Sequence, residues 1–398
     1  MANISQLSYF IIELEEININ IIRPVVKIKR IKRLPLLILS LTILMSACEY
    51  KEKVEIPQEI TRTVDIISQT INSKDRKGFL ECIDINNSEF YAEENHLFED
   101  IESADITNLK LQITGLSRVN DSIYNVDLIQ SYDLNNEKNS IKYTGVFKSY
   151  NGSFKFHDLY FDIISTDHFT IKYSPSLSKE AQLFSAFVED AYKNVKNIYG
   201  ITPSGRTIIK LYEDNDVFSW FIKPSINFLM SGWYEYPESI KINLGLQKEK
   251  KYDEPTFRIK YLKTLSHELT HRTNMQESNN NIPYWMAEGI ATFVENNGVL
   301  KISPPALKVT ELEKINLEKL SESKDISDYY TNSYINVSLF INKFGLNKLH
   351  DILRELGKFP LQVRTGGPSI EDSNNKFHKV IESCLSLTIN QLDREISK

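Results

Sequence analysis

The stretch His267-Glu268-Leu269-Thr270-His271, followed after a loop by Trp285-Met286-Ala287-Glu288-Gly289, carries the strongest structural and chemical signal in this chain. Residues four apart on a helix lie on one face, so the two histidines can direct imidazole nitrogens toward one zinc ion at about 2.0–2.1 Å. Glu268 would project beside the ion, where a carboxylate can take a proton from a water molecule and pass it on. A catalytic zinc site needs a third protein ligand and an open position, and Glu288 is a candidate for that ligand.

The sequence around these residues favours helices over a chance match, which is expected in roughly one chain in a hundred with this many histidines. Asp253–Thr273 is predicted to be a helix, because Pro255 suits a first turn and apolar residues recur at helical spacing. Asn279-Asn280-Asn281 marks a turn, and Pro283 can open a second helix that carries Glu288. The second helix can return to face the first, which would bring the three candidate ligands together.

The segments LSHELTH and PYWMAEGIATFVE resemble the gluzincin metallopeptidases, and most of all the bacterial peptidase MA-like family. The resemblance covers roughly residues 166–398, and the matching segments are an opening strand His168–Tyr173, a helix Ala181–Tyr199, a strand Thr207–Tyr212, a helix pair Tyr334–Phe344 and Gly345–Leu349, and a closing helix Ser386–Glu395. It implies a small sheet, an active-site helix and a C-terminal helical subdomain. It also implies a zinc-dependent peptidase with His267, His271 and Glu288 as ligands and Glu268 as the catalytic base.

The sequence departs from that family at one position. The family often has a carboxylate four residues after the glutamate ligand, and Thr292 stands there in this chain. Such a carboxylate orients a ligating histidine, and its loss can reduce metal affinity or activity by about 10–100-fold. Glu295, about one helical turn further on, is a candidate replacement.

The same resemblance suggests where a substrate would bind. Ser231–Tyr236 and Ile240–Leu244 are predicted strands joined by Pro237-Glu238, and the first corresponds to the exposed edge that pairs with substrate in gluzincins. The alternative is a buried strand, because Trp233 also suits a core. For the group that stabilises the oxyanion, Tyr329, Tyr330 and Tyr334 are candidates, and the position of Tyr334 at the start of the family-like helix favours it.

The start of the chain resembles a bacterial lipoprotein signal peptide. A basic run at residues 27–33 precedes the apolar run Leu34–Leu44 and then Met45-Ser46-Ala47-Cys48. Cys48 would become the lipidated N-terminus of the mature chain, and two or more acyl chains give stable membrane anchoring. A transmembrane anchor is the alternative, but the apolar run falls well short of the roughly 20 residues that span a bilayer. Residues 1–26 suit neither scheme, which suggests that translation starts later or that the chain has a cytoplasmic extension.

The charge and the cysteine content argue against a nucleic-acid-binding protein and against a disulfide-rich one. The chain has 47 basic and 53 acidic residues, and removing residues 1–47 takes away six basic and three acidic ones, which changes the net charge from −6 to −9. This balance argues against a nucleic-acid partner, for which a basic face is expected. Cys82 and Cys384 are far apart in sequence, so we expect small buried side chains rather than a disulfide framework.

A separate α+β domain is predicted from residue 54 to residue 165, between the signal segment at 1–48 and the peptidase-like domain at 166–398. Helical patterns at 54–72 and 79–101 precede four predicted strands, Leu109–Leu116, Ile123–Tyr132, Ser140–Tyr150 and Ser153–Ile164. Asn151-Gly152 is typical of a type I′ hairpin turn. The order of elements is similar to the nuclear-transport-factor-two-like cone. His96 and His157 lack ligand spacing, and we expect them to be surface or satisfied structural residues.

Two classes of function follow. The first is a zinc peptidase tethered to the outer face of a bacterial cell membrane, acting on a peptide or protein. The second is a non-catalytic binding or chaperone-like lipoprotein, with a structural or vestigial zinc site and a ligand in the N-terminal cone. The intact Glu268 favours the enzyme, because a structural site needs no acid beside the metal.

Overall fold

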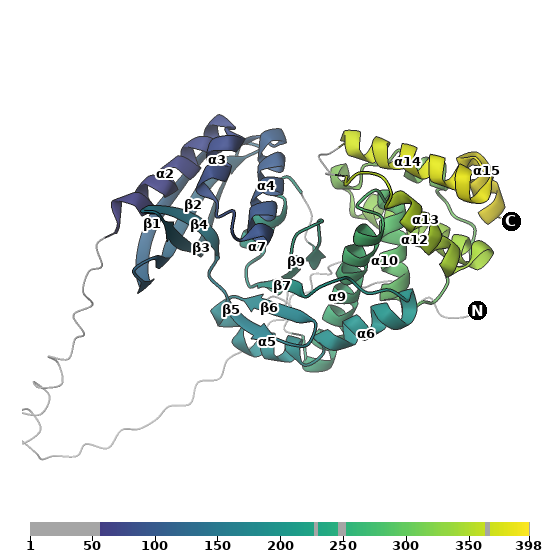
Figure 1. Cartoon of the computed structure of the whole chain (residues 1–398), viewed down its shortest axis with the longest axis horizontal. Coiled ribbons are helices and arrows are strands. Elements are labelled where there is room, and N and C mark those ends of the chain that lie inside the picture. Colours follow the sequence, from purple (N-terminus) through teal and green to yellow (C-terminus); the bar gives the residue numbers. More distant parts are fainter. Residues whose placement is uncertain (1–55, 227–229, 246–251, 363–366, 398) are drawn as a thin grey trace, which may run out of the picture. The chain divides into compact units, whose positions relative to one another are not determined.

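The computed structural model describes residues 56–226, 230–245, 252–362 and 367–397, and Figure 1 shows the arrangement of their elements. The residues from Val54 to Lys398 form one compact unit. Within it the fold is mixed, with helices and an antiparallel sheet first and a second sheet with further helices after it.

The first half follows the predicted order of helices and then strands. Three helices, α2 (Gln58–Ser73), α3 (Arg76–Cys82) and α4 (Ser88–Ser103), precede β1 (Ile106–Asn120), β2 (Ile123–Leu134), β3 (Glu137–Tyr150) and β4 (Ser153–Leu159). The strands form an antiparallel sheet in the order β1-β2-β3-β4. Asn151 and Gly152 both have positive φ, 52° and 84°, as a type I′ turn requires, so this hairpin prediction is confirmed.

The second sheet has five strands in the order β5-β6-β7-β9-β8, namely β5 (Asp162–Ser165), β6 (Phe169–Tyr173), β7 (Thr207–Tyr212), β9 (Ile240–Asn243) and β8 (Gly232–Trp233). The strands β6, β7 and β9 are parallel, and β5 and β8 are antiparallel edges. The single strand predicted over residues 153–164 is therefore wrong. The chain leaves the first sheet after Leu159, and β5 pairs with β6, so residues 162–165 belong with the second sheet.

The remaining α-helices all follow β5 in the chain. They are α5 (Ser178–Ser185), α6 (Val188–Tyr199), α7 (Asn215–Ile222), α9 (Glu254–Glu277), α10 (Tyr284–Glu295), α11 (Val309–Leu312), α12 (Ser323–Phe344), α13 (Leu346–Leu356), α14 (Gly367–Leu385) and α15 (Ile389–Ile396). The helix predicted over 181–199 is two helices with a break between Ser185 and Val188. Gly200 ends α6 with φ 87°, in the left-handed region that glycine adopts without strain.

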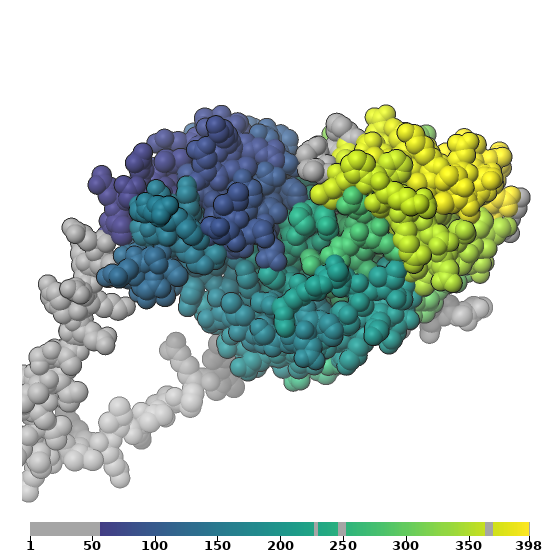
Figure 2. Space-filling model, in the orientation of Figure 1, coloured from purple at the N-terminus to yellow at the C-terminus, as the bar shows by residue number. Residues whose placement is uncertain are grey.

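Two hydrophobic cores form, and they do not divide where the sequence suggests. One lies under the second sheet and its helices. The other contains the inner faces of α2–α4 and the first sheet, and α7 from the second half completes it. The rings of Trp220 and Tyr132 are 4.5 Å apart, and those of Phe221 and Tyr143 are 5.2 Å apart. The atoms of residues 56–165, purple to blue in Figure 2, pack directly against the teal atoms of the following segment.

Among the described helices, none has both the length and the apolar character needed to cross a membrane.

Candidate metal centre

Two helices place the candidate ligands. Asp253 caps α9 by accepting a hydrogen bond from the backbone N–H of Thr256 at 3.0 Å, and the helix then carries His267 and His271 on one face. Glu288 lies on the first half of α10. The next residue, Gly289, allows close packing against α12, because a Cβ there would come within 2.4 Å of the Ser333 carbonyl oxygen. The glycine thus fixes how deeply α10 lies against α12.

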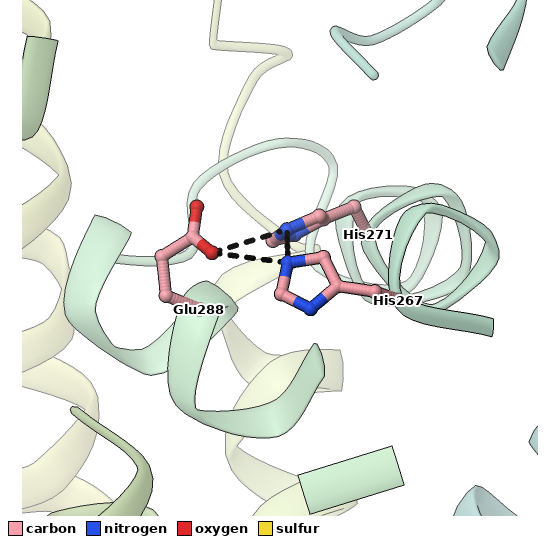
Figure 3. A group of neighbouring side chains, drawn as sticks. All are labelled: His267, His271 and Glu288. Carbon is pink, nitrogen blue, oxygen red and sulfur yellow. Dashed lines mark hydrogen bonds and ion pairs between the residues drawn. The ribbon is translucent and has the colours of Figure 1, made fainter. Parts of the chain in front are cut away.

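The three predicted ligands converge on one point, as Figure 3 shows. The Nε2 atoms of His267 and His271 are 3.0 Å apart, and Oε2 of Glu288 lies 3.2 Å from the first and 3.4 Å from the second. Zinc ligands at about 2.0–2.1 Å in a tetrahedral arrangement lie about 3.3–3.4 Å from one another. The spacing of the three atoms therefore fits one zinc ion after a small outward movement of the imidazoles.

The protonation of these groups also fits a cation. Burial raises the pKa of Glu288, but the imidazoles of His271 and His267 outweigh burial and hold that pKa well below its ordinary value. Burial lowers the pKa of His267, but its contacts with Glu288 and Glu295 outweigh burial and raise it well above its ordinary value. The carboxylates of Glu288 and Glu295 thus favour a positive charge at the point where the three ligand atoms meet. A metal ion would supply that charge.

Glu295, the candidate for orienting a ligand histidine, contacts His267. Its Oε2 atom lies 3.1 Å from Nδ1 of His267, whereas the buried hydroxyl of Thr292 has no hydrogen-bond partner among the described residues. A carboxylate can only accept here, so the contact keeps a proton on Nδ1, and with zinc bound Nε2 would carry a lone pair in place of the proton that faces Glu288. This is the tautomer that binds a metal through Nε2.

Glu268 is buried beside the ligand triad and faces the cleft. Burial raises the pKa of its carboxyl, and this outweighs the lowering by His267 and His271. Its side chain packs on Gly232 of β8, where an added Cβ would lie 2.8 Å from Oε1 of Glu268. Gly232 was not recognised from the sequence, because only the folded chain brings β8 against α9.

A cleft that is partly open to solvent lies in front of the triad. One wall is β8 and the residues after it, from Gly232 to Tyr236, and β8 is an edge of its sheet. The predicted strand over Ser231–Tyr236 lies at the edge of the sheet, but only Gly232–Trp233 form a strand there, and Trp233 is half-buried. Other lining side chains are Met275, Tyr284, Leu317, Glu318 and Tyr330.

The tyrosines downstream of Glu288 differ in whether they face the cleft. Tyr330 lines the cleft, with its ring 6.2 Å from that of His267. Burial, and then the nearby Glu288 and Glu268, hold the pKa of Tyr330 well above its ordinary value, so its hydroxyl stays protonated. Tyr334 instead donates its hydroxyl hydrogen to the carbonyl oxygen of Val299. The structure brings Tyr330, and not the favoured Tyr334, to the metal ligands.

The two histidines of the N-terminal domain have ordinary partners. Nδ1 of His157 lies 2.6 Å from Asp84. Nδ1 of His96 lies 2.5 Å from Oε1 of Glu238, and Glu235 is close to both. This separation is that of a short hydrogen bond rather than of two ligands on one metal ion, so His96 forms an ion pair. Both histidines are thus satisfied structural residues, as the sequence predicts.

Cys48 and the proposed signal peptide lie outside the described residues. Neither Cys82, which is buried, nor Cys384, which is half-buried, is in a disulfide.

In comparisons with known proteins, no family model matches this chain and no curated protein is similar to it.

Proposed function

We propose that this chain is a zinc-dependent peptidase of the gluzincin type. One observation carries the proposal: the nitrogens of His267 and His271 and a carboxylate oxygen of Glu288 converge within 3.4 Å of one another, with Glu268 beside them in a cleft walled by an edge strand. The arrangement of sheet, paired helices α9 and α10, and C-terminal helices supports the gluzincin-type domain arrangement that the sequence suggests.

The residues divide the chemistry of peptide hydrolysis among them. Bound zinc would polarise the scissile carbonyl and make water acidic. The Glu268 carboxylate accepts the proton of the attacking water and then gives it to the leaving amine. The hydroxyl of Tyr330 donates a hydrogen bond to the developing oxyanion. The main chain of Gly232–Tyr236 pairs with the substrate backbone, and the cleft side chains hold substrate side chains.

The binding-lipoprotein alternative has less support from the fold. A ligand in the N-terminal cone would need space against the first sheet, but Trp220 and Phe221 of α7 pack there and leave a cavity of only about 20 Å³. A structural zinc site would also have no need for a buried carboxyl at Glu268.

For location, we propose lipid anchoring at Cys48 on the outer face of a bacterial membrane, on the basis of the signal-like sequence alone.

The test uses Glu268→Gln in the full chain. Glutamine keeps the size of the side chain but cannot take the proton, so zinc content and thermal stability should match the wild type. Loss of a general base reduces the rate by about 10²–10⁴-fold, measured by mass spectrometry of a peptide-library digest. Equal digestion by the variant and the wild type, or digestion by neither when both hold zinc, would refute the peptidase proposal.

A matched variant, His271→Ala, separates metal binding from catalysis. It removes one of three ligands, and we expect stoichiometric zinc to be lost together with peptidase activity. Retention of one zinc per chain by His271→Ala would contradict the ligand assignment.

A further inference from the structure

Buried charges connect the N-terminal domain to the strands beside the candidate active site. Lys210 on β7 lies 2.6 Å from Oε2 of Glu93 on α4 and 2.7 Å from Asp158 on β4. Lys241 on β9 lies 3.5 Å from the other oxygen of Glu93. Both lysine side chains are only 1% exposed. A buried lysine needs such partners, because an unpaired charge in the interior costs several kcal/mol.

The same helix contacts the turn that follows β8. Glu93 and His96 are three residues apart on one face of α4. His96 holds Glu238 through its Nδ1 atom at 2.5 Å, and Glu93 accepts hydrogen bonds from both the backbone and the hydroxyl of Ser239. Glu238 also accepts a hydrogen bond from Lys241 through its second oxygen. Glu238 is 3% exposed, so its contact with His96 is shielded from water.

This turn is continuous with the wall of the cleft. The strand β8 is only two residues long, and its register on β9 is given by Gly232 opposite Ile242 and Trp233 opposite Lys241. The residues between β8 and the turn line the cleft, and Gly232 packs on Glu268. So short a strand has few ladder hydrogen bonds of its own. Its position therefore depends on how the turn at Glu238 is held.

We infer that α4 of the N-terminal domain holds the substrate-binding edge of the active site, with His96 and Glu238 as positioning residues for the substrate main chain. The inference rests on the proposed function, because it assumes that this edge binds a peptide. It assigns a role to the N-terminal domain, which is to form the outer support of the cleft. It also predicts that disturbing His96 affects substrate binding before it affects zinc.

The test compares three variants of the full chain. His96→Ala removes the hydrogen bond to Glu238, and His96→Asn retains an amide N–H near the position of Nδ1. His157→Ala is the matched control, because it breaks a similar histidine–carboxylate pair in the same domain away from the turn. Amide hydrogen exchange of residues 230–245 is followed by mass spectrometry, together with zinc content, and neither measurement requires a substrate.

We expect His96→Ala to raise exchange in residues 230–245 at least about ten-fold, the scale of one lost charged hydrogen bond, with zinc unchanged. His96→Asn should return exchange to within about two-fold of the wild type, and His157→Ala should leave it there. On a peptide that the wild type cleaves, His96→Ala should raise KM about ten-fold and change kcat by less than about two-fold.

Unchanged exchange and unchanged KM in His96→Ala would overturn the inference, as would an equal effect of His157→Ala. If His96→Ala gives no folded protein, Glu238→Gln serves in its place, since it keeps the side-chain size and weakens the same contact. Should the wild type cleave no peptide, the peptidase proposal fails, and the exchange measurement still decides whether α4 holds the edge strand.

Discussion

Nδ1 of His267 lies 3.1 Å from Oε2 of Glu295, so this histidine has a carboxylate partner although position 292 is a threonine. Glu295 lies one turn beyond Thr292 on α10, and its longer side chain extends back to His267. The contact gives the first prediction, which concerns how strongly the site holds zinc.

Glu295→Ala should weaken zinc binding by about 10–100-fold, because His267 loses the partner that fixes its tautomer and its ring. Zinc affinity is measured by competition with a chromogenic chelator. Thr292→Ala is the control and should bind zinc within about two-fold of the wild type, since the Thr292 hydroxyl makes no hydrogen bond to any described residue. Equal affinities in the two variants would show that Glu295 does not orient the site.

Tyr330→Phe should lower kcat by about 10²–10³-fold and leave zinc content and KM close to the wild type, because it removes a donor to the oxyanion. Tyr334→Phe removes the same atom one turn away, where the hydroxyl bonds to Val299. We expect that variant to lose some thermal stability and to keep its kcat. The opposite pattern in steady-state kinetics would assign the oxyanion to Tyr334.

Gly232→Ala should reduce kcat and spare the metal. The new methyl group would come 2.8 Å from Oε1 and 2.9 Å from Cγ of Glu268, so the base must move. A shift of about 1 Å in a catalytic group can cost about 10²-fold in rate. Gly115→Ala, whose methyl group would meet the end of the Asp127 side chain in the first sheet, is the control. Full activity of Gly232→Ala at normal zinc content would argue against the placement of Glu268.

The pH dependence of stability should report on His96. Burial lowers the pKa of its imidazole, but the carboxylates of Glu235, Glu238 and Glu99 outweigh burial and raise it to about 9. Because the folded-state pKa is raised, protonated His96 stabilises the fold fully below about pH 6.5, and this contribution is lost as the pH rises through about 9.

The free energy of unfolding of the wild type should therefore fall more steeply between about pH 7 and pH 10 than that of His96→Asn, which has no imidazole to titrate. Denaturant unfolding at several pH values measures the difference. Lys223 and Lys241 also face this group of carboxylates, so the comparison is between variants rather than between pH values alone. Parallel curves would mean that His96 is neutral in the folded chain.

Cys48→Ser should abolish lipid attachment, because acylation requires the thiol. The wild type should partition into the detergent phase and carry a lipidated N-terminal residue 48, both measurable by phase separation and mass spectrometry. The serine variant should be unprocessed or released. An uncleaved N-terminus in a wild-type chain that stays in the membrane would favour a transmembrane anchor.

The sequence predicted the convergence of His267, His271 and Glu288 because local rules govern it. The spacing of His267 and His271 determines their shared face on α9, and the turn before Pro283 brings Glu288 back toward them. Tyr330 and Tyr334 show the limit of such rules. They lie four residues apart on one face of α12, so spacing cannot tell which turn is level with His267, His271 and Glu288; the packing of α10 on α12 decides it.

Other features depended on contacts that no local pattern contains. His96 and Glu238 are 142 residues apart in sequence, and neither has a spacing that marks it as part of a site. The strand predicted over 153–164 continued too far because apolar residues recur throughout this stretch and no Gly, Pro or Asn interrupts it. Only the pairing of β5 with β6 shows that the chain changes sheets near Tyr160 and Phe161.

The position of α7 has a consequence for how the chain acquires its structure during synthesis. Residues 56–159 leave the ribosome first, but Trp220 and Phe221, which complete their hydrophobic core, follow some 60 residues later. Until then the inner face of the first sheet exposes Tyr132 and Tyr143 to water. The early segment therefore becomes fully stable only when part of the later segment has been made. The segment that is synthesised first therefore cannot complete its folding first.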